Sequence, residues 1–275
     1  MRVRRGTTRV HATSNNNVHL FNPAGAGRIA RIPHVVHQSY ISLDHLTPAM
    51  RTAMDRTMEL ARLSGWEYRF YRDQDCRDYI ARHMPHMLQA YDGLIPKAFK
   101  ADLFRYCLLF VEGGLWLDIT DCPSPSVTHM SVLVPAGAQF VSATDASGIC
   151  ACHAEPGPPT PGCYPAIFQA ILASVPRSPT LLTAIRMIES NYRTKALEGG
   201  RGFPHLAVTG PVLLGRAVKK VTPPRAVWYR HTWRWRYTDC DCVVDSTGHS
   251  KLIDVGPSAS LNQHYLDDFI NRRVY

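Results

Sequence analysis

Lys100-Ala-Asp-Leu-Phe-Arg-Tyr-Cys-Leu-Leu-Phe-Val-Glu-Gly-Gly-Leu-Trp-Leu-Asp118 is the stretch of sequence that decides the fold. Apolar residues recur in it at spacings of three and four, which predicts a helix with a wide face that can pack on a sheet. Asp102, Arg105 and Tyr106 lie at i, i+3 and i+4 on another side of this helix. A carboxylate and a guanidinium are therefore presented side by side.

The end of this stretch predicts a tight turn followed by a short buried strand. Gly113-Gly114 can supply a left-handed helix C-cap, and Leu115–Leu117 is a hydrophobic strand that ends at Asp118. In open α/β sheets, ligands bind outside the carboxyl ends of strands. The carboxylates of Asp118 and Asp121 at this position suit Mg²⁺ or Mn²⁺, which prefer oxygen ligands and bridge carboxylates to substrate phosphates.

A plainer interpretation of Asp118-Ile-Thr-Asp121 is a helix N-cap at Asp121 and an ordinary strand-end carboxylate at Asp118. Isolated short motifs match by chance often. The preceding helix, glycine pair and buried strand favour the functional interpretation here.

Segments on both sides of this stretch alternate between strand and helix patterns, which predicts an α/β fold with a less regular C-terminal part. Residues 1–30 show no periodicity and are interpreted as a flexible arm. We expect one catalytic domain over 31–275, with a nucleotide-sugar half at 31–122 and an acceptor-side half at 123–275. The expected elements are strands at 32–38, 66–71 and 115–118, one or two strands within 133–144, and helices at 48–64, 73–92, 97–112, 166–173 and 179–192, with a proline-rich loop at 155–165.

The composition excludes a disordered chain, because 45% of the 275 residues are hydrophobic and only 19% are charged. The net charge of +9 attracts nucleic acid, anionic membranes or phosphorylated small molecules. Because zinc-finger spacing and RNA-binding aromatic signatures are absent from the sequence, we expect a diphosphate-bearing ligand and no nucleic acid.

The sequence also predicts a cytoplasmic protein. It has no signal-like N-terminus, and no apolar run approaches the ~20 residues that span a bilayer. We therefore expect reduced thiols, although a structural zinc site is an alternative. The eight cysteines are Cys76, Cys107, Cys122, Cys150, Cys152, Cys163, Cys240 and Cys242.

The central stretch resembles the glycosyltransferases with a DXD-containing sugar-binding region, whose usual form is close to D-L-x-R-Y-x-x-L-x-x-x-G-G-x-Y-x-D-x-D. Ile32-Pro-His-Val-Val-His-Gln-Ser-Tyr40 is similar to the family's opening I-P-K-x-I-H-Q-x-W, and Thr209-Gly-Pro211 resembles a later T-G-P. The family includes fungal initiating mannosyltransferases, capsular polysaccharide enzymes and glucosylating toxins. The match is firm over 31–122, and two motifs about 65 residues apart in the right order make coincidence improbable.

This resemblance implies a GT-A-type fold, with a Rossmann-like nucleotide-binding half and a mixed sheet, and it implies a role for each matched residue. Asp118 is implied to be the first DXD carboxylate, on the metal and diphosphate side. Asp102 and Arg105 are implied to hold the donor sugar and its phosphates. The implied catalytic residues are Asp118, Asp102 and Arg105; the implied donor-binding residues are His37, Gln38, Tyr40, Asp102, Arg105 and Tyr106; and the implied metal ligands are Asp118, Asp121 and His264, with His231 as the alternative to His264.

Two positions depart from the family pattern. Thr120 stands where the second DXD aspartate is usual, and the acid comes one residue later at Asp121. Because strand side chains alternate in direction, Asp121 joins Asp118 only if the chain has already turned. Tyr40 replaces the usual tryptophan, a milder change.

Weaker candidates lie in the C-terminal half. Asp145 and Gln169 fall where acceptor and sugar contacts are expected. The stretch from Trp228 to Tyr237 alternates aromatic residues with arginines, which predicts a strand whose aromatic face is either an acceptor platform or part of the core.

These observations predict a metal-dependent, retaining glycosyltransferase that moves a hexose from a UDP- or GDP-sugar to a glycan or protein hydroxyl, with Mn²⁺ or Mg²⁺ as cofactor. Two alternatives stay open. One is a catalytically weak or inactive protein of the same fold that binds nucleotide sugars or carbohydrate, and the other is a basic nucleic-acid-binding protein.

Overall fold

A computed structural model of the chain describes residues 30–145, 149–150, 155–156, 165–195, 204–235, 238–255 and 274–275. The arm expected at 1–30 lies outside the described residues except for Ala30. In the part of the chain described here, no helix is both long and apolar enough to cross a membrane.

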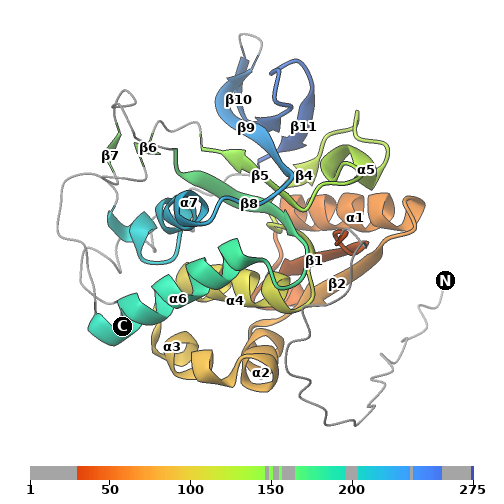
Figure 1. Ribbon diagram of the computed structural model, residues 1–275. Helices are drawn as coiled ribbons and strands as arrows, with labels where there is room; N and C mark the ends of the chain where they lie inside the picture. The colour runs from red at the N-terminus through yellow and green to blue at the C-terminus, as the bar shows by residue number, and fades with distance from the viewer. Residues whose placement is uncertain are drawn as a thin grey trace, which may run out of the picture.

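The core of the fold is a nine-stranded mixed sheet in the order β2-β1-β3-β8-β5-β9-β10-β11-β4 (Figure 1). β1 pairs in parallel with β2 and β3, β8 runs antiparallel between β3 and β5, and β5 is parallel to β9. A separate two-stranded sheet joins β6 and β7. The strands are β1 Val35–Ser39, β2 Glu67–Tyr71, β3 Gly114–Leu117, β4 Cys122–Pro123, β5 Phe140–Thr144, β6 Ile149–Cys150, β7 Glu155–Pro156, β8 Ile167–Ser174, β9 Ala226–Trp235, β10 Thr238–Val244 and β11 Lys251–Asp254.

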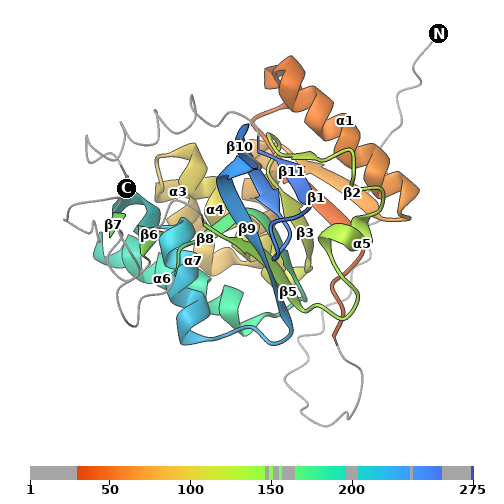
Figure 2. The same ribbon diagram turned by 90° about the horizontal axis from the view of Figure 1, so that it is seen from above.

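Helices cover both faces of the sheet (Figures 1 and 2). Helices α2, α3, α4, α6 and α7 build one hydrophobic core, whereas α1 and α5 build the other. The strands between them alternate, so Trp116 of β3 enters the first core while Leu115 and Leu117 enter the second. The helices are α1 Pro48–Leu63, α2 Asp73–His83, α3 Leu88–Gly93, α4 Lys97–Val111, α5 Met130–Leu133, α6 Pro179–Thr194 and α7 Pro211–Lys220, with 3-10 turns η1 Leu43–His45, η2 Pro85–Met87 and η3 Pro204–Ala207.

The fold-class prediction is confirmed. Strands β2, β1 and β3 with their connecting helices form the expected Rossmann-like half, and the antiparallel β8 makes the sheet mixed. Thr47 caps α1 through its side chain, and Pro48 stands at the first helical position.

The glycine pair between α4 and β3 is required by geometry. Gly113 and Gly114 have φ values of +71° and +103°, which residues with a Cβ rarely adopt. A Cβ on Gly114 would also lie 2.7 Å from Cγ1 of Val35 on the neighbouring β1. The turn therefore brings the end of α4 directly against the sheet, as the sequence predicts.

Two element predictions are wrong. Residues 167–174 form strand β8, where a helix was expected at 166–173. The helix expected at 73–92 is broken around Pro85, which cannot continue a helix. Helix α1 itself is confirmed, and its buried stripe runs through Met54, Leu60 and their neighbours while Met58 is 41% exposed.

Candidate functional site

A buried guanidinium at the carboxyl end of β3 joins two carboxylates. Arg105 on α4 is 4% exposed, and its Nη2 donates to Oδ1 of Asp118 over 2.8 Å. Its Nη1 donates to the carbonyl of Gln169 on β8 over 2.9 Å and lies 3.7 Å from Oδ1 of Asp102. The i, i+3 spacing on α4 and the short strand that follows bring these three charges together, as the sequence predicts.

Asp118 is held by two elements while staying accessible. Besides Arg105, the indole Nε1 of Trp116 donates to Oδ1 of Asp118 over 2.7 Å. The side chain of Asp118 is still 34% exposed. Trp116 did not figure among the expected site residues, although alternation along β3 places residues 116 and 118 on the same side of the strand.

A second layer surrounds Asp102, which is only 4% exposed. Oδ1 accepts from Nε2 of Gln169 (2.5 Å), and Oδ2 accepts from the hydroxyl of Thr209 just before α7 (2.8 Å). The hydroxyl of Tyr106 lies within hydrogen-bond distance of Gln169 Oε1 and, at 3.0 Å, of the Thr209 carbonyl. Tyr106 is fully buried, and its hydroxyl contacts only protein groups of this network among the described residues.

Burial and charge act in opposite directions in this cluster. Burial raises the pKa of Asp102 to about 6, although the charge of Arg105 opposes the shift. For Arg105, burial lowers the pKa, but the carboxylates of Asp118 and Asp102 outweigh it and the net pKa is raised. Asp121 adds to this effect, so its charge also acts on the guanidinium.

The chain turns immediately after Asp118, which is the condition for Asp121 to lie on the same side as Asp118. The backbone N–H of Asp121 donates to the carbonyl of Asp118 over 2.9 Å and closes a turn over residues 118–121. Asp121 is 1% exposed, however, and its Oδ1 accepts from the hydroxyl of Thr120 over 3.2 Å. Asp121 is thus near the cluster electrostatically while its carboxylate is turned away from solvent.

Asp118 fits the kind of divalent-cation site in which the protein supplies only one or two carboxylates. Among the described residues no group of three or more histidine, cysteine, aspartate or glutamate side chains is gathered to hold a metal. Asp118 offers a partly exposed carboxylate, and Mg²⁺ is often held by one or two carboxylates plus substrate phosphates. His264 lies outside the described residues. His231 is buried, with Nδ1 3.5 Å from Oδ1 of Asp145.

The three expected donor residues near β1 occupy different environments. His37 is fully buried; its Nε2 contacts the Gly113 carbonyl (3.0 Å) and its Nδ1 the hydroxyl of Tyr71 (3.1 Å). Both ring nitrogens therefore contact protein groups, and burial lowers the pKa of His37 to about 4. Contact of His37 with the nucleotide stays a prediction, and in this structure its ring lies against Gly113 and Tyr71. Gln38 is buried too but contacts Asp118, whereas Tyr40 is partly exposed.

A cavity of about 260 Å³ opens where β1 ends, between α2, α3 and α4. Ser39 lies at the carboxyl end of β1, and Asp73 begins α2 after β2. Lys97 and Lys100 on the first turn of α4 also line the cavity. It therefore lies on the carboxyl-end edge of the parallel strands, the same edge as Asp118.

The weaker candidates are partly placed. Asp145 and His231 adjoin each other, and the ring of His231 stacks on Phe168 at 4.0 Å. Strand β9 confirms the strand predicted near 228–237, with Trp228 packed against the first core.

Cys242 is disulfide-bonded, which corrects the expectation of reduced thiols and removes it as a zinc ligand. The other cysteines with described side chains, Cys76, Cys107 and Cys122, are free.

Two curated proteins of Schizosaccharomyces pombe are similar to the chain. Inositol phosphoceramide mannosyltransferase 3 is 29% identical over 90 residues, 33% of this chain and 24% of that protein. Inositol phosphoceramide mannosyltransferase 2 is 23% identical over 206 residues, 73% of this chain and 51% of that protein. The chain is therefore similar in sequence to two fungal mannosyltransferases. It spans about half the length of one of these relatives and about a quarter of the other.

Two solved glycosyltransferase structures have low similarity to the chain. No protein-family model matches it. The structure titled PaToxG Glycosyltransferase has a TM-score of 0.45 at 13% identity, over 70% of this chain and 71% of that one. A glycosyltransferase involved in the glycosylation of the major capsid of PBCV-1 has a TM-score of 0.33 at 13% identity, over 71% of this chain and 81% of that one.

We expect Asp102→Asn to change how stability depends on pH. Because burial raises the pKa of Asp102, its contribution to stability is full below pH ~4 and is lost as the pH rises through about 6. His37 has the opposite sign, since its lowered pKa favours the folded state above pH ~6.5 and that contribution is lost as the pH falls through about 4. Only the difference between wild type and variant therefore isolates Asp102.

Urea unfolding at pH 4 and pH 7 checks this prediction. The free energy of unfolding of wild type minus that of Asp102→Asn should fall by about 2–3 kcal/mol between the two pH values. An equal difference at both pH values would show that the aspartate is not protonated in the fold near pH 6.

Proposed function

We propose that the chain transfers a hexose from a nucleotide diphosphate sugar to an acceptor hydroxyl. The observation that carries the proposal is the buried Asp102–Arg105–Asp118 cluster, which leaves one carboxylate partly exposed where β3 ends. Catalytic groups in α/β sheets lie at such strand ends. The similarity to mannosyltransferases makes mannose the first hexose to test.

The donor fits this edge of the sheet in two parts. The nucleotide would occupy the cavity beside Ser39, with Lys97 and Lys100 near its phosphates and the partly exposed ring of Tyr40 available for stacking. The sugar and diphosphate would lie toward Asp118.

Each residue of the cluster then has a distinct task. Asp118 would hold a divalent ion, Mn²⁺ or Mg²⁺, with Asp121 contributing charge behind it; such an ion, when bound, neutralises diphosphate charge. Arg105 fixes the orientation of Asp118 through a direct hydrogen bond. Asp102 orients Arg105 from the other side. A retaining outcome is part of the proposal and rests on the family resemblance.

The acceptor would approach from the C-terminal half. We propose residues 31–122 as the donor half and 123–275 as the acceptor half, with Asp145 and Gln169 on the acceptor side. The names of the fungal relatives suggest an inositol-phosphate headgroup as the first acceptor to test. Its negative charge suits a chain of net charge +9.

One observation favours a second candidate, an inactive protein that still binds donor. Asp121, the nearest acid to the usual second DXD position, is 1% exposed. A buried carboxylate contributes less to an exposed ion, so metal affinity and turnover would both be low.

Calorimetry with GDP-mannose and UDP-glucose, each with and without Mn²⁺, tests the proposal. We expect donor binding that requires the ion, accompanied by slow donor hydrolysis in the absence of acceptor. Binding without hydrolysis or transfer would select the inactive protein. Affinity for an oligonucleotide and for neither donor would reject both candidates.

A further inference from the structure

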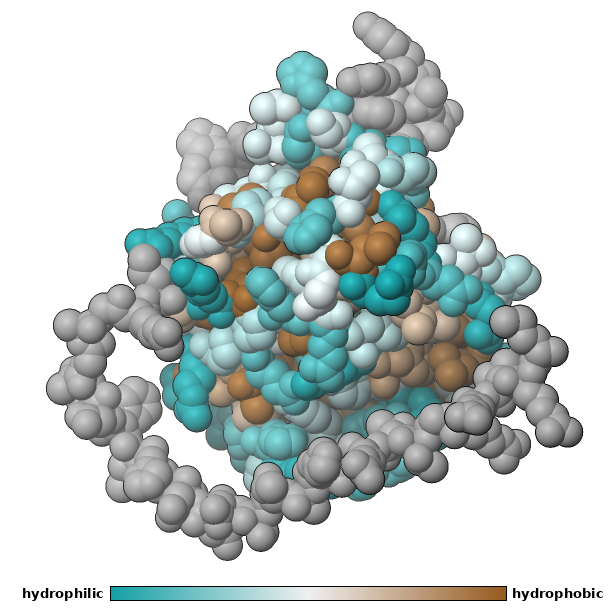
Figure 3. Space-filling view, turned by 90° about the vertical axis from the view of Figure 1, so that its right-hand side faces the viewer, coloured by the Kyte–Doolittle hydropathy of each residue, from teal (hydrophilic) through white to brown (hydrophobic). Residues whose placement is uncertain are grey.

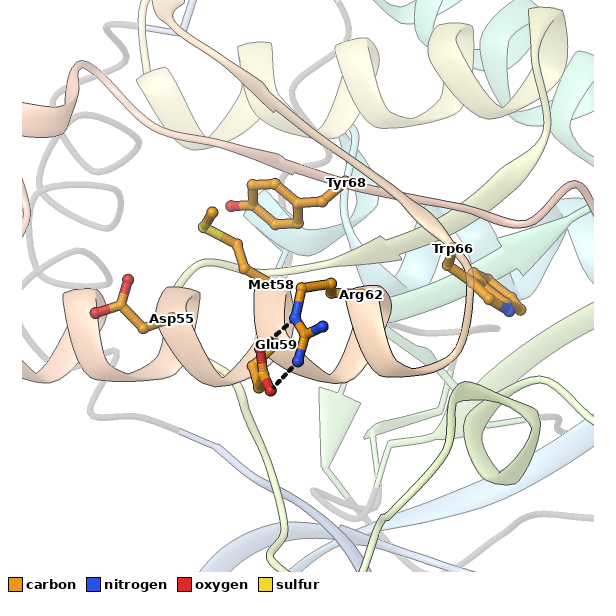
Figure 4. A pocket seen from close by; sticks show the side chains of 6 residues that line it. All are labelled: Asp55, Met58, Glu59, Arg62, Trp66 and Tyr68. Carbon is orange, nitrogen blue, oxygen red and sulfur yellow. Dashed lines mark hydrogen bonds and ion pairs between the residues drawn. The ribbon is translucent and has the colours of Figure 1, made fainter. Parts of the chain in front are cut away.

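Tyr68 connects the surface of the molecule to the turn after β3. It lies on the edge strand β2, and its ring lines a surface pocket of about 450 Å³ together with Met58 and other residues of α1. Figure 4 shows the ring above α1, with the hydroxyl directed away from Trp66. The face of the molecule that carries α1 is a mosaic of polar and hydrophobic surface (Figure 3).

The hydroxyl of Tyr68 begins a chain of two hydrogen bonds. It donates to Oε1 of Gln38 over 2.8 Å, and Nε2 of Gln38 donates to the carbonyl of Asp118 over 3.2 Å. Burial raises the pKa of Tyr68, so the hydroxyl remains a donor throughout the ordinary pH range. Gln38 is fully buried, and its amide orientation is therefore set by these two partners.

The chain ends on the atom that closes the turn. The carbonyl of Asp118 accepts from Gln38 and also from the backbone N–H of Asp121. Two donors occupy both lone pairs of this oxygen, which fixes the peptide plane that follows Asp118. On the other side of the sheet, Arg105 and Trp116 hold the Asp118 carboxylate. The residue is thus held at its backbone from the α1 side and at its side chain from the α4 side.

We propose that Tyr68 is a positioning residue for the candidate site: acting through Gln38, it fixes the Asp118 carbonyl and with it the turn from which the carboxylates of Asp118 and Asp121 project. This inference rests on the proposed function for its effect on the donor. Its effect on the turn is independent of any ligand. A merely structural role would stabilise the fold and leave donor affinity unchanged.

Tyr68→Phe removes one oxygen and keeps the ring, so it is the first variant to make. Tyr229→Phe is the matched control, because that hydroxyl also lies on the α1 side and donates to backbone carbonyls at Val132 (2.8 Å) and Leu133 (3.1 Å), away from Asp118. Amide hydrogen exchange over residues 119–121 is measured without ligand. We expect about 5–10-fold faster exchange there in Tyr68→Phe than in wild type, which corresponds to the net free energy of one hydrogen bond. In Tyr229→Phe we expect the exchange rate over 119–121 to equal that of wild type.

Gln38→Met tests whether the two residues act in series. It retains side-chain length and removes both hydrogen-bonding groups, so adding Tyr68→Phe to it should not increase exchange further. Additive effects of the two substitutions would overturn the proposal. So would exchange over 119–121 that is unchanged in Tyr68→Phe or equally fast in Tyr229→Phe.

Donor affinity separates this inference from the proposed function. With Mn²⁺ and GDP-mannose or UDP-glucose, we expect Tyr68→Phe to bind about 5–10-fold more weakly than wild type, following the loosened turn. Faster exchange with unchanged donor affinity would reduce Tyr68 to a structural role and overturn the proposal. If wild type binds neither donor, the proposed function fails, while exchange still decides whether Tyr68 fixes the turn.

Discussion

Asp118→Ala is expected to abolish metal-dependent donor binding and to lower any transfer rate by about 10²–10³-fold, the cost of removing one aligned electrostatic group. Asp118 is the partly exposed acid of the cluster, and the proposed ion would depend on it. The fold should persist, because water can reach a side chain that is 34% exposed and can replace part of its contact with Arg105 and Trp116.

Calorimetry with Mn²⁺ and each donor measures this effect, and circular dichroism reports the fold. Glu59→Ala is the control, since that acid lies in an exposed ion pair with Arg62 on α1 and should leave donor binding unchanged. Full donor affinity in a folded Asp118→Ala protein would reject the metal assignment.

Arg105→Met is expected to cost about 3–5 kcal/mol of folding stability, the usual result of removing one partner from a buried ion pair. The substitution leaves Asp102 buried without its neighbouring positive charge and removes the donor to the Gln169 carbonyl. Arg105→Lys should recover little, because one ammonium cannot reproduce the forked contacts to Gln169 and Asp118.

Urea unfolding measures the loss, and the double variant Arg105→Met/Asp102→Asn gives its cause. Removing both charges should restore part of the stability and none of the donor binding. Arg62→Met is the matched control, since Arg62 forms an exposed pair with Glu59 on α1. A double variant no more stable than Arg105→Met would show that the uncompensated Asp102 charge is not what destabilises the protein.

Strand β8 shows where sequence periodicity fails. Ile167-Phe-Gln-Ala-Ile-Leu-Ala-Ser174 is nearly continuous in apolar residues, and such a run fits a buried strand or a buried helix equally well. Its place between β3 and β5 gives it neighbours on both edges, and both faces contact a core. The helix predicted at 166–173 was wrong because tertiary pairing, which local pattern does not contain, decides such runs.

The environments of His37 and Gln38 likewise depend on the sheet. Because side chains alternate along β1, those of His37 and Gln38 must point to opposite faces of the sheet. The motif resemblance nevertheless grouped both as ligand-binding residues. His37 lies against Gly113 and Tyr71, and Gln38 lies against Asp118. Neither partner is near in sequence, so the sequence could indicate the direction of each side chain and not what it would meet.

The sequence by itself determined the helix, the glycine turn and the strand that ends at Asp118, together with the pairing of Asp102 with Arg105. Those features depend on spacings of a few residues and on φ values that favour glycine. Tertiary structure alone decided the hydrogen bonding and the pKa of the Asp102 carboxyl. Its partners Gln169 and Thr209 are 67 and 107 residues away in sequence. Tertiary structure also turned Asp121 back toward the cluster and buried it. Burial and long-range hydrogen bonds arise from packing whole elements together, so the local spacing that places these charges cannot set their energies.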